Sequence, residues 1–172
     1  MADPNVLDFL RIPPNVLVTL DWRPYHFALQ PYHFLVRIGH VLSMAAFFGG
    51  VAFLDLRLMG SLAALPLRFV AQQVLPWLYV TFGVAIISGL ALFLYDPVHV
   101  GSHAYFTLKL ILTALGLVNA ALLRRSSYLT TSAEAAPTPY TRVAGALSLA
   151  LWVGVIVCAC LNVEAPPKVL LR

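Results

Sequence analysis

Four long apolar runs constrain the fold of this chain more than any other feature. They cover about residues 36–58, 72–95, 104–123 and 142–162. About 20 helical residues, each rising about 1.5 Å, cross the roughly 30 Å hydrocarbon layer of a membrane. A helix satisfies its own backbone hydrogen bonds inside lipid, and the alternating segments of a membrane β-barrel are absent from the sequence. The runs therefore predict an all-α fold, an integral membrane four-helix bundle.

Composition favours lipid as the solvent for much of the chain. Of 172 residues, 60% are hydrophobic and 10% are charged. A soluble domain has about 45–50% apolar and about 25% charged residues. The net charge of +4 does not form a nucleic-acid-binding stripe, because the basic residues flank the apolar runs, where membrane topology requires them. We expect the lipid bilayer as a partner and no nucleic acid.

The basic residues also predict an orientation. The connection between the first two spans carries Arg57 and Arg68, and the connection between the last two carries Arg124, Arg125 and Arg142. The connection between the second and third spans has neither Lys nor Arg. The positive-inside rule then places both termini outside. Because this middle connection is short, we also expect the second and third spans to be antiparallel neighbours.

Outside the spans, the sequence predicts an outer interfacial arm over residues 1–34, a bundle over 35–163 and a short tail over 164–172. The arm repeats one apolar phrase, PNVLDFL at 4–10 and PNVLVTL at 14–20. Such patches are typical of a segment that lies on a membrane surface or on a partner protein. A disordered tail is the alternative, although disordered segments are normally less apolar.

The arm also contains the unit Pro-Tyr-His-Phe twice, at residues 24–27 and 31–34. With His40 this makes a series of histidines seven residues apart. On one helix, residues seven apart share a stripe but lie about 10.5 Å apart along the axis. His33 and His40 therefore cannot both bind one metal ion directly, since each ligand lies about 2 Å from the ion. We interpret His26 and His33 as part of an interfacial aromatic belt.

Three polar residues in or near the spans are candidates for cofactor binding: His40, His103 and Lys109. His40 lies inside the first apolar run. It is predicted to be an axial ligand of haem b, a quinone hydrogen-bond partner or a plain interhelical hydrogen-bonding group. His103 is the best candidate for a second haem ligand. Lys109 either extends to the outer headgroups or pairs with Asp96 or with an anionic group of a ligand.

Other polar residues are expected to be structural. At the inner ends of the spans, a polar cap is predicted to lock the helix ends together: Asp55, Arg57, Trp77 and Asn119. The two cysteines, Cys158 and Cys160, are two residues apart. On a helix they point about 200° apart, so we expect two inert thiols rather than a metal site.

The most specific motif is a D-L-R-L-x-G box at residues 55–60, with His40 fifteen residues ahead of its aspartate. Further motifs accompany it: Gly49-Gly50, Leu75-Pro76-Trp77, Ser88-Gly89, Phe106, Lys109 and Asn119. Over roughly residues 35–125 the chain resembles a family of uncharacterised bacterial four-helix inner-membrane proteins. The resemblance implies a multi-pass protein of the bacterial inner membrane, with both termini periplasmic in the orientation above, and implies no activity. A looser similarity links the chain to four-helix cytochrome b and copper-resistance membrane proteins, but their spread of intramembrane histidines is missing.

No catalytic triad, zinc-protease motif, phosphate loop or dinucleotide fingerprint occurs in the sequence, so the chain is not expected to be an enzyme. The leading hypothesis is a non-catalytic membrane subunit of a larger redox or energy-converting complex, with the arm and the spans contacting other membrane subunits. One alternative is an electron carrier that binds haem b or quinone through His40. Another is a small transporter or a copper-handling protein that uses the outer histidines.

Overall fold

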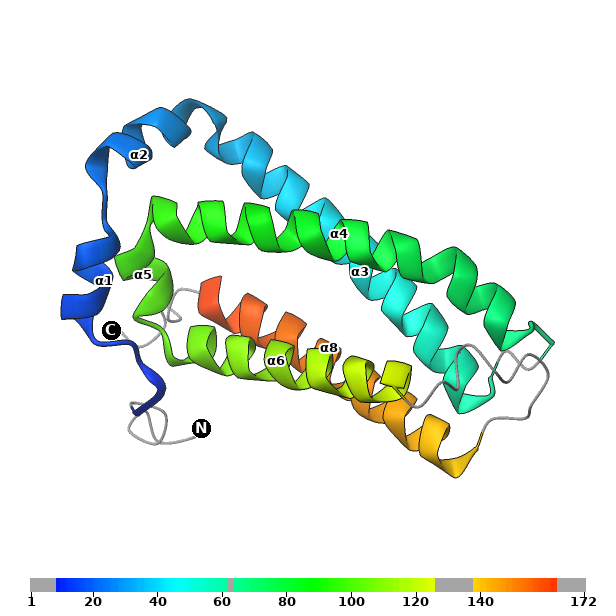
Figure 1. Cartoon of the computed structure of the whole chain (residues 1–172). Coiled ribbons are helices and arrows are strands. Elements are labelled where there is room, and N and C mark those ends of the chain that lie inside the picture. Colours follow the sequence, from blue (N-terminus) through cyan, green and yellow to red (C-terminus); the bar gives the residue numbers. More distant parts are fainter. Residues whose placement is uncertain (1–8, 62–63, 126–137, 164–172) are drawn as a thin grey trace, which may run out of the picture.

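The computed structural model describes residues 9–61, 64–125 and 138–163, and within these ranges it contains helices and no strand. Four long helices dominate: α3 (His33–Met59), α4 (Leu67–Tyr95), α6 (Ala104–Arg125) and α8 (Pro139–Val163). Figure 1 shows them as one elongated bundle. All four are long and apolar enough to cross a membrane. The predicted all-α membrane bundle is confirmed, and the chain is a multi-pass membrane protein.

The helices extend beyond the apolar runs, mostly at their N-termini. α3 begins at His33, α4 at Leu67 and α8 at Pro139, each three to five residues before the predicted span. Polar or aromatic first turns lower the hydropathy of a run but do not prevent helix formation. A proline favours the start of α8, where Pro139 is the first residue, because a proline lacks only an N–H that the first turn leaves unpaired. Gly60 caps the C-terminal end of α3 with a φ of 98°, the left-handed conformation that glycine adopts readily.

The helices pair in an order that the connection lengths did not predict. α3 packs mainly on α4, α6 packs mainly on α8, and α3 crosses α8 to join the two pairs. α4 and α6, which the short middle connection joins, are therefore not the closest backbone partners. Long side chains link them instead, with Phe93 stacked on Phe106 at 4.9 Å and Arg124 donating to the Tyr79 hydroxyl. Two antiparallel spans that follow one another in the sequence are therefore not always the pair that packs most closely.

An aromatic cluster lies where the helix pairs meet. Phe47 of α3 lies 4.7 Å from Trp152 of α8 and 5.0 Å from Phe82 of α4, measured between ring centroids. Trp152 is 4% exposed. Glycine makes room for it, because a Cβ on Gly116 of α6 would lie 3.1 Å from the indole ring. This cluster therefore connects all four long helices.

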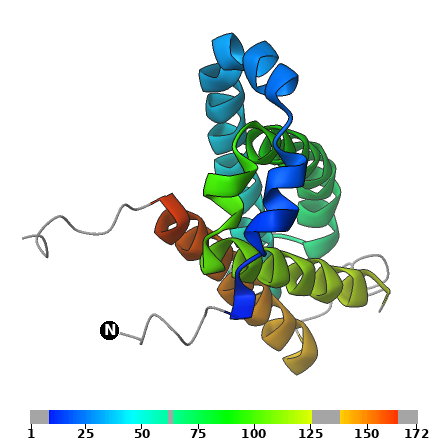
Figure 2. The ribbon, with the colours of Figure 1, turned by 90° about the vertical axis from the view of Figure 1, so that its left-hand side faces the viewer.

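The N-terminal arm forms short helices that pack on one end of the bundle. α1 (Pro14–Leu20) packs on α5 (Pro97–Gly101), and α2 (Arg23–Leu29) packs on the end of α4. A short 3-10 helix, η2 (Gln30–Tyr32), leads from α2 into α3. Leu17 is fully buried against Gly101. Figure 2 shows α1 and α2 across this end of the bundle. Residues 14–32 are thus ordered against the chain's own helices.

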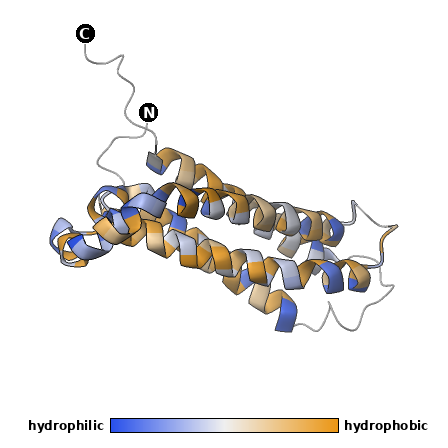
Figure 3. Cartoon of the chain, turned by 90° about the horizontal axis from the view of Figure 1, so that it is seen from above, coloured by the Kyte–Doolittle hydropathy of each residue, from blue (hydrophilic) through white to orange (hydrophobic). Residues whose placement is uncertain are grey.

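The outer surface of the bundle is apolar. Figure 3 shows hydrophobic residues along the long helices and hydrophilic residues mostly near their ends. In the most apolar windows of α4 and α6, only 17% of the residues are buried inside the chain. Most of their surface is therefore left for lipid or for other protein helices.

Candidate functional site

The doubled Pro-Tyr-His-Phe unit has one structural target, the ring of Tyr95. The His26 ring stacks on it at 4.2 Å with an interplanar angle of 15°, and the His33 ring stacks on it at 4.3 Å and 29°. Two rings can both stack this closely only on opposite faces of the third. The two histidines of the repeat therefore hold Tyr95 between them.

Two hydrogen bonds strengthen this attachment of α2 to α4. The Tyr25 hydroxyl donates to the Ala91 carbonyl at 3.1 Å. Nδ1 of His26 lies 3.0 Å from the Tyr95 carbonyl, which can only accept, so Nδ1 carries the proton in this contact. Tyr25, His26 and His33 thus contact the chain's own α4, in addition to any role in an interfacial belt.

Replacing Tyr95 by leucine should loosen α2 without unfolding the bundle. Each lost ring stack is worth about 0.5–1.5 kcal/mol. We expect faster hydrogen–deuterium exchange in residues 23–29, together with an almost unchanged melting temperature. Tyr140→Leu on the exposed start of α8 is the control. Equal exchange in the two variants would show that the stack does not hold α2.

His40 contacts the backbone of the neighbouring helix. Its Nδ1 atom lies 3.0 Å from the Ala85 carbonyl and 3.0 Å from the Ser88 hydroxyl oxygen, both on α4. A Cβ on Gly89 would lie 2.9 Å from the imidazole ring. Gly89 therefore provides the space for the ring, and Ala85 and Ser88 provide its polar partners.

This geometry assigns the tautomer of His40. The Ala85 carbonyl only accepts, so the proton is assigned to Nδ1, and Nε2 keeps its lone pair. Metal-binding histidines usually have this arrangement, in which one ring nitrogen donates to a carbonyl and the other is available. The bond to α4 is the interhelical hydrogen bond that the sequence offered as one role for His40. The haem and quinone roles stay predictions.

Replacing His40 by alanine should weaken the α3–α4 contact by about 1–2 kcal/mol, because it removes an intramembrane hydrogen bond and some packing. Ser88→Ala should cost less, since Nδ1 keeps the Ala85 carbonyl. Denaturant titration in detergent micelles, followed by circular dichroism, measures both. Equal losses in the two variants would contradict the dominant role of the carbonyl.

His103 and Lys109 lie toward the same end of the bundle as His40. The rings of His103 and His99 meet edge to face at 5.6 Å. The Lys109 ammonium lies 5.2 Å from the centroid of Phe106, and Lys109 is within electrostatic range of both His40 and Cys158. A cation over an aromatic face is stabilised by the ring quadrupole. Among the three predicted residues, these contacts bring Lys109 within electrostatic range of His40, whereas His103 contacts His99.

The described residues contain no group of three or more His, Cys, Asp or Glu side chains that could hold a metal ion. Cys158 is buried and Cys160 is exposed, and both are free thiols. The sequence prediction of a small transporter or copper-handling protein thus stays a prediction.

At the other end of the bundle, the predicted polar cap is divided among separate contacts. The Asp55 carboxyl is buried and interacts with the Ser148 side chain of α8. The Arg57 Nε donates to the Leu65 carbonyl, so Asp55 and Arg57 do not pair with each other. The amide of Asn119 donates to the Ala144 carbonyl at 3.0 Å, which ties α6 to α8.

Trp77 does not join this cap. Its side chain is 70% exposed on α4 and faces away from the other helices.

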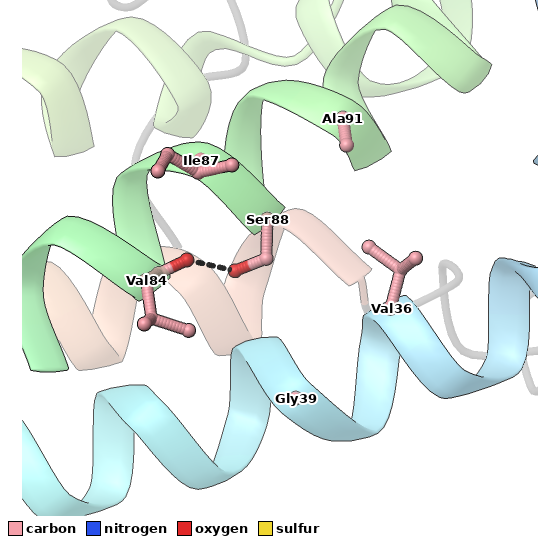
Figure 4. Close-up of a pocket in the computed structure, with 6 residues that line it drawn as sticks. All are labelled: Val36, Gly39, Val84, Ile87, Ser88 and Ala91. Carbon is pink, nitrogen blue, oxygen red and sulfur yellow. Dashed lines mark hydrogen bonds between the residues drawn. The ribbon is translucent and has the colours of Figure 1, made fainter.

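A groove runs along the outer surface between α3 and α4. It has a volume of about 320 Å³ and is open along the surface of the bundle. α3 contributes Val36 and Gly39, and α4 contributes the rest, as Figure 4 shows: Val84, Ile87, Ser88 and Ala91. The four α4 residues follow the i, i+3, i+4, i+7 spacing of one helix face. The groove is therefore formed by one continuous face of α4 against α3.

Sequence reasoning did not identify Tyr95, Ser88 or Gly89 as partners of the histidines. The Ser88-Gly89 pair was visible as a small-residue step in an apolar run, which often marks a close helix contact. Tyr95 carried no distinguishing pattern, since its role depends on where α2 packs.

No protein-family model, curated protein or solved structure matches this chain. The resemblance to four-helix inner-membrane proteins therefore rests on the motif residues alone.

Proposed function

We propose that this chain is a non-catalytic integral membrane subunit that packs against another membrane protein through the groove between α3 and α4. One observation carries the proposal. Gly39 lies on the groove in the interior of a long helix, and a Cβ there would meet nothing within 4 Å. A glycine in a helix interior costs about 1 kcal/mol relative to alanine, and nothing within the described chain uses the space it leaves.

Other glycines in the bundle show how this chain uses such space. Gly50, Gly116 and Gly145 each face a close neighbour on another helix, namely Leu78, Trp152 and the Asp55 backbone. Gly39, Gly49 and Gly83 lack such a neighbour, and of these three only Gly39 lines the groove. Small residues permit close helix approach in membranes, where dispersion contacts rather than the hydrophobic effect drive association. A helix from a partner would use Gly39 as Gly50 is used inside the bundle.

The chemistry of the groove indicates what kind of partner fits. Five of its six lining residues are apolar or glycine, and the Ser88 hydroxyl donates within its own helix to the Val84 carbonyl. An apolar transmembrane helix with small residues at its contact face is the complementary partner. We infer the bacterial inner membrane as the setting, in keeping with the motif resemblance, and propose that the partner belongs to a redox or energy-converting complex.

Photo-crosslinking in the native membrane tests this proposal. A photoreactive phenylalanine analogue replaces Ile87, which lies on the groove and is 72% exposed. We expect a crosslink to one defined membrane protein, and its loss when Gly39→Leu fills the groove. The analogue at Val118, exposed on α6, and Ala114→Leu, also exposed on α6, are the matched controls. Crosslinks to lipid alone, or a crosslink that Gly39→Leu leaves unchanged, would contradict the proposal.

A second candidate function is electron transfer by haem b or quinone bound at His40. It is favoured by the fixed Nδ1 contact with Ala85, which leaves the Nε2 lone pair for a ligand. Lys109, within electrostatic range of His40, would favour an anionic group nearby.

The absorption spectrum of protein purified from its native membrane tests the haem version. A Soret band that His40→Ala removes and His103→Ala weakens would support it. Absence of the band, or a band that His40→Ala leaves unchanged, would exclude haem bound at His40.

A further inference from the structure

The carboxyl of Asp55 is an unusual group for the interior of a membrane bundle. Asp55 is 4% exposed and lies four residues before the end of α3. Its Oδ2 atom is buried and has no hydrogen-bond partner. The Ser148 side chain on α8 interacts with the carboxyl. No hydrogen bond therefore compensates Oδ2 for the hydration that it loses on burial.

The charged groups on the surrounding helices are directed elsewhere. Arg57, on the same helix, donates from Nε to the Leu65 carbonyl. α3 packs against α4 and α8, whose basic residues at this end, Arg68 and Arg142, are exposed. A buried carboxylate normally requires a cation or several donors, because desolvation strongly disfavours an unpaired charge. Neither is present around Asp55 in the described residues.

We propose that Asp55 is a proton-binding site inside the bundle, held as a neutral carboxylic acid between α3 and α8. This site is independent of the groove and of His40, which lies fifteen residues away along α3. The neutral acid needs fewer partners than the carboxylate, which matches the single Ser148 contact. Ionisable residues in such positions commonly mark sites where protons enter or leave a membrane protein.

A proton fits the site better than a metal ion. Hard cations take six or more oxygen ligands in the usual case. The carboxyl oxygens of Asp55 and the hydroxyl of Ser148 supply three, and the described chain has no cluster of three His, Cys, Asp or Glu side chains. A proton needs only the carboxyl itself.

Reaction with dicyclohexylcarbodiimide, an apolar reagent for protonated carboxyls, tests the proposal on the full chain in detergent at neutral pH. The acid adds across a C=N bond: its oxygen bonds to the central carbon, its proton moves to nitrogen, and no group leaves. The adduct then rearranges to a stable N-acylurea of the same composition. Peptide mass spectrometry should find the reagent on Asp55, and Asp55→Asn should abolish that signal. Asp21→Asn, at an exposed carboxyl, should leave it unchanged.

Infrared spectroscopy makes the test independent of reagent access. The difference between the wild type and Asp55→Asn should show the carbonyl band of a protonated acid in the wild type. Loss of a carboxylate band instead would overturn the proposal, whatever the labelling result. Labelling that persists at its full level in Asp55→Asn would also overturn the assignment to this residue.

Discussion

Trp152→Ala is expected to destabilise the bundle by about 3–5 kcal/mol, the usual cost of removing a large buried aromatic side chain. The indole is 4% exposed and contacts Phe47 and Phe82 edge to face, at 4.7 and 6.0 Å. Gly116 lies against the same ring. Because one side chain joins all four long helices, its loss leaves a cavity that no single helix can close.

Trp77→Ala is the matched control for this prediction. Its side chain is 70% exposed on α4, so its removal should change stability by about 0.5 kcal/mol or less. Denaturant titration in detergent micelles, followed by far-ultraviolet circular dichroism, measures both variants. Similar midpoints for the two would show that the aromatic cluster does not hold the helices together.

Gly145→Leu should be nearly as damaging as the loss of Trp152. A Cβ at this position of α8 would lie 3.0 Å from the Asp55 backbone oxygen and 3.1 Å from the Leu58 Cβ. Backbone atoms cannot move aside as a flexible side chain can, so α3 and α8 must separate. Overpacking commonly costs about 1–3 kcal/mol and sometimes more, and four added carbons place this change at the upper end.

Gly49→Leu serves as its control, because a Cβ there would meet nothing within 4 Å. The melting temperature in detergent and the fraction of monodisperse protein measure the two variants. We expect loss of folded protein for Gly145→Leu and wild-type behaviour for Gly49→Leu. The reverse order would mean that α3 and α8 do not cross at Gly145.

The four spans could be predicted from the sequence because the length and the hydropathy of an apolar run depend only on local composition. The starts of α3, α4 and α8 were less predictable, since first turns that contain His33, Arg68 or Arg142 lower the local hydropathy. Helix pairing was not predictable from connection length. It depends on which glycines meet which side chains, and the contact of Gly116 with Trp152 carries no signature in either segment.

In the candidate site, too, local features could be predicted from the sequence and contacts between helices could not. The seven-residue spacing predicted that His33 and His40 do not share one ion, and the structure gives them different contacts, the Tyr95 ring for His33 and the Ala85 carbonyl for His40. The position of His40 inside an apolar run predicted that it needs a partner. Its partner is a backbone carbonyl, that of Ala85, and no sequence motif marks a carbonyl. The repeat of Pro-Tyr-His-Phe was visible, but its target, Tyr95, lies 62 residues after His33. Only the packing of α2 on α4 brings these rings together.

Native mass spectrometry of the particle extracted from its own membrane in mild detergent tests whether this chain is a subunit that packs on another membrane protein. The chain has a mass of 18.8 kDa. As a packing subunit, it should appear in a larger particle with a second membrane protein in fixed stoichiometry, and Gly39→Leu should release it while Ala114→Leu should not. A wild-type particle that contains this chain alone, as a monomer or only as copies of itself, would show that the chain is not such a subunit.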